Sequence, residues 1–145
     1  VSALQIADMN GDGRNDLVVG CYSSQSVPAY TDWENMIYYN VGGGLETEPS
    51  WISTDEVSTI DLQVADINRD GFPHIYAANG LGAASVIYYG SASGPSTSPG
   101  WFSTVPGNTF AVSAAIFDVD RDGDLDVFTG NQGLTQASPF RPMYG

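Results

Sequence analysis

Three short segments of the chain place oxygen-bearing side chains at alternate positions. In each segment Asp stands at position 1, Asn or Asp at position 3, Asp at position 5 and Gly at position 6. Calcium is a hard cation that takes about six to eight oxygen ligands, and a tight loop supplies them from alternate residues. Glycine at position 6 allows the sharp turn, and a backbone carbonyl serves at position 7. The pattern therefore predicts calcium coordination.

The three segments align without gaps and give three candidate ligand sets. In the first and third sets, a further aspartate at position 9 closes the site. The first loop supplies Asp8, Asn10, Asp12, the carbonyl of Arg14, and Asp16. The second loop supplies Asp66, Asn68, Asp70 and the carbonyl of Phe72. The third loop supplies Asp118, Asp120, Asp122, the carbonyl of Asp124, and Asp126.

Position 9 of the second loop departs from this pattern, because it holds His74. Imidazole nitrogen is a poor ligand for a hard cation. A single histidine without cysteine partners also gives little support for a transition-metal site. We interpret His74 as a lost ligand. The sequence therefore predicts two strong Ca²⁺ sites, in the first and third loops, and one weaker site in the loop that ends at His74.

Other loops share part of this spacing. An EF-hand needs a glutamate at position 12 and flanking helices, but position 12 here holds Val19, Ala77 and Thr129. Asx-rich turns without a metal are the remaining alternative. Three aligned copies, each followed by a short apolar strand, argue against that alternative.

Composition narrows the possible partners. The chain has 17 acidic residues against four arginines, no lysine, and a net charge of -13. Ten of the 17 acidic residues fall in the three loops, where only a cation would relieve their mutual repulsion. A charge of this sign repels nucleic acid and anionic membranes, and no apolar run is long enough to span a bilayer. We therefore expect no nucleic-acid partner and no membrane insertion. Cys21 is the only cysteine, which excludes an internal disulfide.

The loops lie within a longer repeat that must position them. Residues 36–40 recur at 86–90, and residues 51–54 recur at 101–104. Each unit then contains four short runs rich in β-branched and aromatic residues, separated by Gly, Pro, Ser and Asn, which is typical of strands and turns. The predicted fold is all-β, with tandem four-stranded antiparallel blades of β-propeller type.

The boundaries follow from the repeat. We expect a single repeat domain over 1–145, with blade 1 at about 1–57, blade 2 at about 58–108 and a partial blade 3 at about 109–145, whose third strand would lie at 142–144. A propeller ring needs about four to eight blades. About two and a half to three blades leave the ring incomplete within this chain. Either the sequence belongs to a longer chain, or copies assemble into a homo-oligomer.

The motif resembles a known family. Asp-x-Asn/Asp-x-Asp-Gly-x-x-Asp-Leu/Val, a strand ending in Gly, Ile-Tyr-Tyr and a Pro-x-Trp-x-Ser hairpin are similar to FG-GAP/VCBS repeats. These repeats form the β-propellers of integrin α-chains, of some secreted lectins and of many secreted bacterial proteins. The resemblance implies that calcium binds in the hairpin between the first two strands of a blade and stabilises it. It also implies a location outside the cell or at the cell surface.

The favoured function is a non-catalytic extracellular binding or adhesion module with a carbohydrate or protein ligand. Trp51 and Trp101 recur at the same repeat position, which favours packing between blades over ligand contact. Trp33 and Tyr30 are the better ligand-binding candidates, because both lie in the insert 23–35 that only the first unit carries.

Two alternatives stay open. One is a structural protomer of a self-assembling surface filament or ring, since the ends of an open repeat array must be covered. The other is part of a polysaccharide-active enzyme. The chain has one histidine, no lysine and no nucleophile motif. The acidic pair Asp32 and Glu34 is better explained as a solvated loop than as a glycosidase pair, so we expect no catalytic residue.

Overall fold

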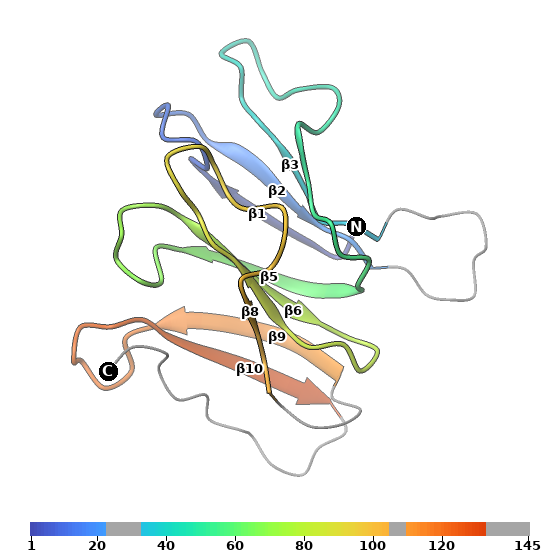
Figure 1. The fold of residues 1–145 in the computed structure, drawn as a ribbon, viewed down its shortest axis with the longest axis vertical. Helices are drawn as coiled ribbons and strands as arrows, with labels where there is room; N and C mark the ends of the chain where they lie inside the picture. The colour runs from blue at the N-terminus through green and yellow to red at the C-terminus, as the bar shows by residue number, and fades with distance from the viewer. Residues whose placement is uncertain (23–32, 105–109, 133–145) are drawn as a thin grey trace.

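The computed structural model describes residues 1–22, 33–104 and 110–132, and in these residues it contains β-strands and no helix. The prediction of an all-β chain is confirmed for this part. Within it, no helix is long and apolar enough to cross a membrane. The strands form three antiparallel sheets that follow one another in chain order (Figure 1).

The first two sheets have four strands each, in sequence order. Sheet 1 consists of β1 (Ala3–Ala7), β2 (Asp16–Gly20), β3 (Met36–Tyr38) and β4 (Trp51–Ile52). Sheet 2 consists of β5 (Thr59–Ala65), β6 (His74–Asn79), β7 (Val86–Tyr88) and β8 (Trp101–Phe102). The predicted four-stranded antiparallel units are therefore present twice.

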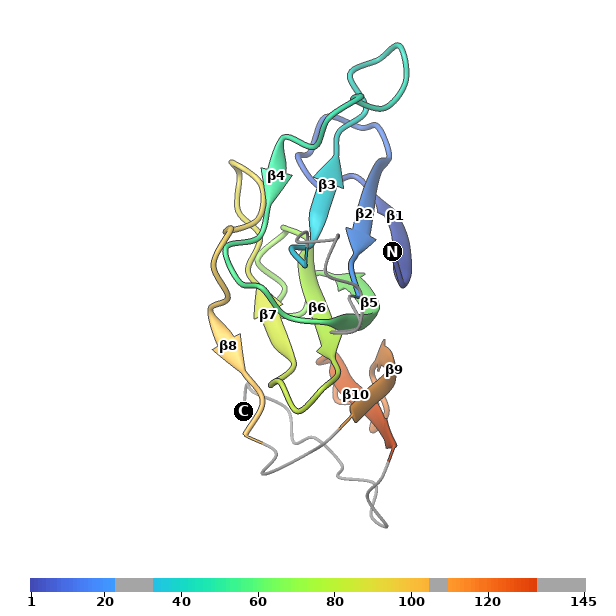
Figure 2. The ribbon, with the colours of Figure 1, turned by 90° about the vertical axis from the view of Figure 1, so that its right-hand side faces the viewer.

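Sheet 3 contains β9 (Phe110–Phe117) and β10 (Asp126–Gln132). The third strand predicted at 142–144 lies outside the described residues. Figure 2 shows the first strands of the three sheets, β1, β5 and β9, along the same side of the molecule. The described sheets do not close a ring.

Each acidic loop is the hairpin that joins the first two strands of its sheet. The residue before position 1 pairs with the residue at position 9 in all three hairpins. These closing pairs are Ala7 with Asp16, Ala65 with His74, and Phe117 with Asp126. Strand pairing alone therefore brings position 9 back beside the start of each loop.

Alternation along the strands gives each sheet two faces. We call them the N-face, directed toward the preceding sheet in the chain, and the C-face, directed toward the following sheet. Between sheets 1 and 2, a C-face packs on an N-face in one hydrophobic core. The C-face of sheet 1 contributes Ala3, Ala7, Val18, Ile37 and Trp51, and the N-face of sheet 2 contributes Leu62, Val64, Ile75, Ala77, Val86 and Tyr88.

The junction between sheets 2 and 3 repeats this arrangement. The C-face of sheet 2 contributes Ala65, Tyr76, Ala78, Ile87 and Trp101, and the N-face of sheet 3 contributes Ala114, Ile116 and Val127. Burial of these apolar side chains, at roughly 1.5–3 kcal/mol for each large aliphatic side chain, is the main stabilising term. The expectation that Trp51 and Trp101 pack between sheets is confirmed.

Polar contacts fix the spacing of the sheets. The side-chain amide of Gln5 donates to the carbonyl of Leu62 at 2.9 Å. Across the second junction, the backbone N–H of Ala114 donates to Asp61 Oδ2 at 2.7 Å, and the hydroxyls of Tyr76 and Thr129 lie 2.6 Å apart. Each junction therefore combines an apolar centre with hydrogen bonds to fixed backbone or side-chain partners.

Candidate metal centres

The backbone turns in the same way in all three loops. Position 6 has a positive φ of 82°, 91° and 100° in Gly13, Gly71 and Gly123. Position 4 is left-handed as well, and it is Gly11 in the first loop but Arg69 and Arg121 in the others, with φ of 75°, 59° and 63°. The sequence pattern did not predict this second left-handed position, for which Gly11 was the only signal. Two such residues bend the chain twice and keep positions 1, 3 and 5 on the inside of the loop.

The third loop gathers carboxylates at one point. Asp118, Asp120 and Asp126 each place an oxygen within 4.8 Å of the oxygens of the other two. Asp118 Oδ1 is buried and has no hydrogen-bond partner. Among the described residues it is the one buried side-chain oxygen or nitrogen in that situation. A buried acceptor without a partner is costly, and a carboxylate oxygen more so. A bound cation would satisfy this oxygen, so the donor set fits a hard metal ion.

The remaining carboxylate oxygens hold the third loop in shape. Asp118 Oδ2 accepts from the backbone N–H of Gly123 at 2.9 Å, and Asp126 Oδ2 accepts from that of Val119 at 3.0 Å. Asp122 Oδ1 accepts from the N–H of Asp124 at 2.8 Å. The loop is thus organised by its own backbone while the oxygens facing its centre stay available to an ion.

In the second loop, the acidic side chains lie around His74. Asp66, Asp70 and His74 each place a possible ligand atom within 4.8 Å of the others. The Nδ1 atom of His74 accepts a 2.8 Å hydrogen bond from the backbone N–H of Gly90, and Nε2 lies 2.8 Å from Asn68 Oδ1. A neutral ring whose Nδ1 accepts must carry its proton on Nε2.

This tautomer decides what His74 offers to a metal. Nε2 donates its proton to Asn68 Oδ1 and has no lone pair free for an ion. Burial lowers the pKa of His74, although Asp70 and Asp66 act to raise it, so the ring is held neutral. The geometry supports the interpretation of His74 as a lost ligand, because neither ring nitrogen offers a lone pair to a cation.

The first loop differs from the other two. Within the described residues, Asp8, Asp12 and Asp16 do not form a comparable cluster of three ligand atoms. Asp12 Oδ2 is instead paired with Arg14 Nη2 at 2.6 Å, and Arg14 Nε donates to the carbonyl of Asn40 at 2.7 Å. The guanidinium therefore occupies one carboxylate that the sequence assigned to calcium.

The other two carboxylates of the first loop accept backbone hydrogen bonds. Asp16 is buried, and its oxygens accept from the N–H groups of Met9 and Asn40, both at 2.8 Å. The pKa of Asp8 is lowered: burial acts to raise it, but backbone N–H groups, that of Gly13 foremost, outweigh this effect. The loop's own backbone thus positions both acids, as it does in the third loop.

The first and second loops lie in a segment with a known family pattern. Residues 8–77 match the family model described as FG-GAP-like repeat. This part of the chain is an FG-GAP-like repeat. The match begins at position 1 of the first loop, just after β1, and ends within β6, so it covers β2 to β5 and part of β6. The comparison with curated proteins found no match.

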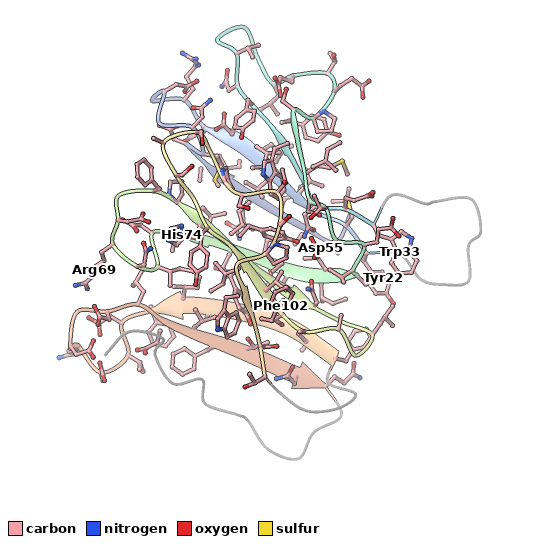
Figure 3. All side chains as sticks on the ribbon, in the orientation of Figure 1. Tyr22, Trp33, Asp55, Arg69, His74 and Phe102 are labelled. Atoms are coloured by element: carbon pink, nitrogen blue, oxygen red, sulfur yellow. The ribbon has the colours of Figure 1, made fainter. Side chains whose placement is uncertain are left out.

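The second and third loops are also in contact with each other. Arg69 of the second loop reaches toward the third loop, where its Nη1 lies 3.5 Å from Asp124 Oδ1 (Figure 3). Its guanidinium also covers Gly123, where an added Cβ would lie 3.1 Å from Nη2. This ion pair is half-exposed and contributes little to the stability of the fold by itself. It does place a positive charge between two acidic loops.

The ligand-binding candidates of the FG-GAP-like module are only partly described. Trp33 is half-buried, and Figure 3 shows it on the same side of the molecule as Tyr22 and Asp55. Tyr30 lies outside the described residues. The structure therefore leaves Trp33 as a candidate whose contact with a ligand stays a prediction.

Proposed function

We propose that this chain is a calcium-stabilised, non-catalytic binding module of the extracellular space, built from blades of the β-propeller type. The observation that carries the proposal is Asp118 Oδ1, buried without a partner beside the carboxylates of Asp120 and Asp126. The FG-GAP-like repeat in residues 8–77 supports the same reading.

The third loop is the best candidate for a filled site. Its donors are all oxygens, which suits Ca²⁺ better than a transition metal. The carboxylates of Asp118, Asp120, Asp122 and Asp126 and the carbonyl of Asp124 would hold the ion. When bound, the ion supplies positive charge that relieves the repulsion among these acids and locks the hairpin between β9 and β10.

Calcium binding would stabilise the fold by mass action. A ligand that binds only the folded state adds about 2.7 kcal/mol at a hundredfold excess over its dissociation constant. Modules outside the cell meet calcium near millimolar levels, which would keep even weak loop sites filled. This link between fold and calcium supports an extracellular location.

The binding role rests on how the chain uses its polar and aromatic residues. Carboxylates cluster where a structural ion fits, and His74 is buried with both ring nitrogens engaged in hydrogen bonds. These structural uses support a non-catalytic role. Trp33, from the insert of the first unit, is an aromatic side chain suited to contact with a carbohydrate or protein ligand.

Thermal unfolding in excess calcium and in excess chelator tests the proposal. Calcium should raise the midpoint of the wild-type chain by several degrees. Asp118→Asn removes one proposed ligand charge and should remove most of this shift. The matched control is Asp124→Asn, which loses the same charge but keeps the backbone carbonyl that would bind the ion. Equal midpoints of the wild-type chain in calcium and in chelator would overturn the proposal.

A second candidate function is a structural protomer of a self-assembling ring or filament. The observation that favours it is the row of exposed apolar side chains on the N-face of sheet 1, which includes Leu4, Ile6 and Ile52. No described sheet covers that face.

A further inference from the structure

The chain contains the dipeptide Asn-Gly twice, at Asn10-Gly11 and at Asn79-Gly80. In this dipeptide the backbone nitrogen of the glycine can approach the side-chain carbonyl carbon of the asparagine, because glycine has no Cβ to obstruct it. Attack of that nitrogen on Cγ closes a succinimide ring and releases ammonia. Since the same dipeptide stands in two different surroundings, the fold decides whether each copy reacts.

Asn10 and Gly11 lie in the open. They occupy positions 3 and 4 of the first loop, and both residues are exposed. A Cβ added at Gly11 would have nothing within 4 Å. Water therefore reaches the Asn10 side chain, and ammonia can leave it without displacing any packed group.

The loop also places polar groups on both reacting atoms. The backbone N–H of Gly11 donates to Asp8 Oδ1 at 2.8 Å, so a carboxylate stands ready to take up the proton that this nitrogen loses as it attacks. The backbone N–H of Asp12 donates to Asn10 Oδ1 at 3.0 Å, which stabilises the negative charge that develops on this oxygen. The nucleophile and the carbonyl group are thus both assisted by neighbours in the loop.

The second Asn-Gly dipeptide has the opposite surroundings. Asn79 is 0% exposed. Its Oδ1 accepts from the hydroxyl of Thr59 at 2.9 Å, and its Nδ2 donates to the carbonyl of Ala84 at 2.8 Å. The N–H of Gly80 donates to the carbonyl of Ser58 at 2.8 Å. The side chain cannot turn toward the Gly80 nitrogen without breaking these hydrogen bonds, and its burial keeps water away.

Position 3 of the second loop is also protected. Asn68 is followed by Arg69, whose Cβ stands where Gly11 has none. Its Oδ1 lies 2.8 Å from His74 Nε2, and its Nδ2 donates to Asp70 Oδ2 at 2.9 Å. The Asn68 side chain is therefore held at both ends. In the third loop position 3 is already an acid, Asp120.

We propose that Asn10 is a site of spontaneous deamidation. The Gly11 nitrogen forms a bond to Asn10 Cγ, the bond from Cγ to Nδ2 breaks, and ammonia leaves with the proton given up by the Gly11 N–H. Water then opens the ring. Attack of water at Cγ restores the peptide bond and leaves aspartate, whereas attack at the backbone carbonyl carbon leaves isoaspartate. Water is the only co-reactant, and both products carry a negative charge that Asn10 lacks.

The two products differ in what they do to the first loop. Aspartate would give this loop acids at positions 1, 3, 5 and 9, as in the third loop. Isoaspartate adds a methylene to the backbone and shortens the side chain, which disturbs the alternate spacing of the donors. Under the proposed calcium function, on which this consequence rests, aspartate strengthens the site and isoaspartate weakens it. The deamidation itself needs no calcium.

Peptide mass spectrometry of the aged full chain tests the inference. The folded chain is kept in chelator at mildly alkaline pH, sampled over time and digested. The peptide with Asn10 should change from amide to acid at least about tenfold faster than the peptides with Asn68 and Asn79. An isoaspartate methyltransferase should label part of the product. In denaturant, where the fold no longer protects it, Asn79 should convert within about threefold of the rate of Asn10.

Gly11→Arg is the matched variant, because Arg69 and Arg121 occupy position 4 of the other loops with φ of 59° and 63°. It should slow the conversion of Asn10 by about tenfold or more. Far-ultraviolet circular dichroism checks that it is folded, and the comparison within the wild-type chain needs no variant. An Asn10 amide as stable as that of Asn68, conversion of Asn10 only after unfolding, or equal rates with and without Gly11→Arg would each overturn the inference. Because calcium is absent throughout, these outcomes do not depend on the proposed calcium sites.

Discussion

His74 Nδ1 accepts a hydrogen bond from the backbone N–H of Gly90 at 2.8 Å. In the preceding repeat, Asp16 Oδ1 accepts one from the backbone N–H of Asn40, also at 2.8 Å. Position 9 therefore has the same structural role whether it is aspartate or histidine. Its side chain links the acidic loop by a hydrogen bond to the backbone at the end of the third strand. The histidine keeps this tie and gives up the negative charge.

Replacing His74 by aspartate should separate the two roles of position 9, which are the hydrogen bond to the end of the third strand and the negative charge offered to a cation. His74→Asp restores the carboxylate at position 9 but buries a charge among other acids. Without calcium the variant should lose about 1–3 kcal/mol of unfolding free energy. With calcium it should show a larger rise in melting midpoint than the wild-type chain. His74→Asn, which keeps an acceptor for Gly90 and adds no charge, is the control. Equal calcium shifts in the two variants would argue against a cation at the second loop.

The neutral His74 ring also predicts a pH dependence. Burial lowers its pKa in the folded chain below the ordinary value of 6.5. The unfolded chain then takes up a proton first as the pH falls, so the contribution to stability is complete above about 6.5 and declines below it. Denaturant unfolding in chelator from pH 7.5 to 5.5 measures this decline. The His74→Asn chain should show a smaller decline over the same range, and an identical decline would contradict the assignment.

Arg14 should compete with calcium in the first loop. Its guanidinium holds Asp12 Oδ2 at 2.6 Å, and a half-exposed pair of this kind contributes about 0.2–1 kcal/mol. Arg14→Gln should therefore raise the calcium affinity of the first loop by roughly two- to fivefold. Titration calorimetry in a chain that also carries Asp118→Asn isolates the effect. Arg121→Gln, in the third loop, changes the charge equally and should leave the affinity of the first loop unaltered.

Tyr88 and Tyr38 allow a matched test of the sheet junction. Tyr88 is fully buried, donates to Asp55 Oδ1 at 2.6 Å and accepts from Asn35 Nδ2 at 3.3 Å. Burial, foremost, and the contact with Asp55 raise its pKa far above the usual range, so the hydroxyl stays a donor. Tyr88→Phe should cost about 1–3 kcal/mol in denaturant unfolding, because it leaves Asp55 and Asn35 short of a partner.

Tyr38 has the same repeat position but lies half-buried on the uncovered N-face of sheet 1. Tyr38→Phe should change the unfolding free energy by less than about 0.5 kcal/mol. A similar cost for both substitutions would mean that burial between sheets does not set the role of this tyrosine.

The sequence predicted the repeat well because its signals are local. Alternating β-branched and aromatic residues predicted the strands, and the Asp spacing placed the three hairpins. The recurrence of Trp51 and Trp101 at one repeat position correctly predicted their packing between sheets. Each of these features depends on neighbours in the chain or on comparison between repeats.

The parts that the sequence did not predict depend on tertiary contacts. The pairing of Arg14 with Asp12 is fixed in part by the carbonyl of Asn40, which the fold brings to the loop. The tautomer of His74 is set by the backbone N–H of Gly90, which lies just beyond the end of β7. Arg69 and Arg121 adopt positive φ because the loop requires it there, against the preference of their own side chains.

The central claim is that the third loop is a calcium site, and a crystal structure with calcium present tests it most directly. An anomalous difference map should show a peak among the carboxylates of Asp118, Asp120, Asp122 and Asp126 and the carbonyl of Asp124. Asp118 Oδ1 should then have the ion as the partner that it lacks within the chain. A third loop without a peak in crystals that hold calcium elsewhere, or a water molecule in the place of the ion, would contradict the account.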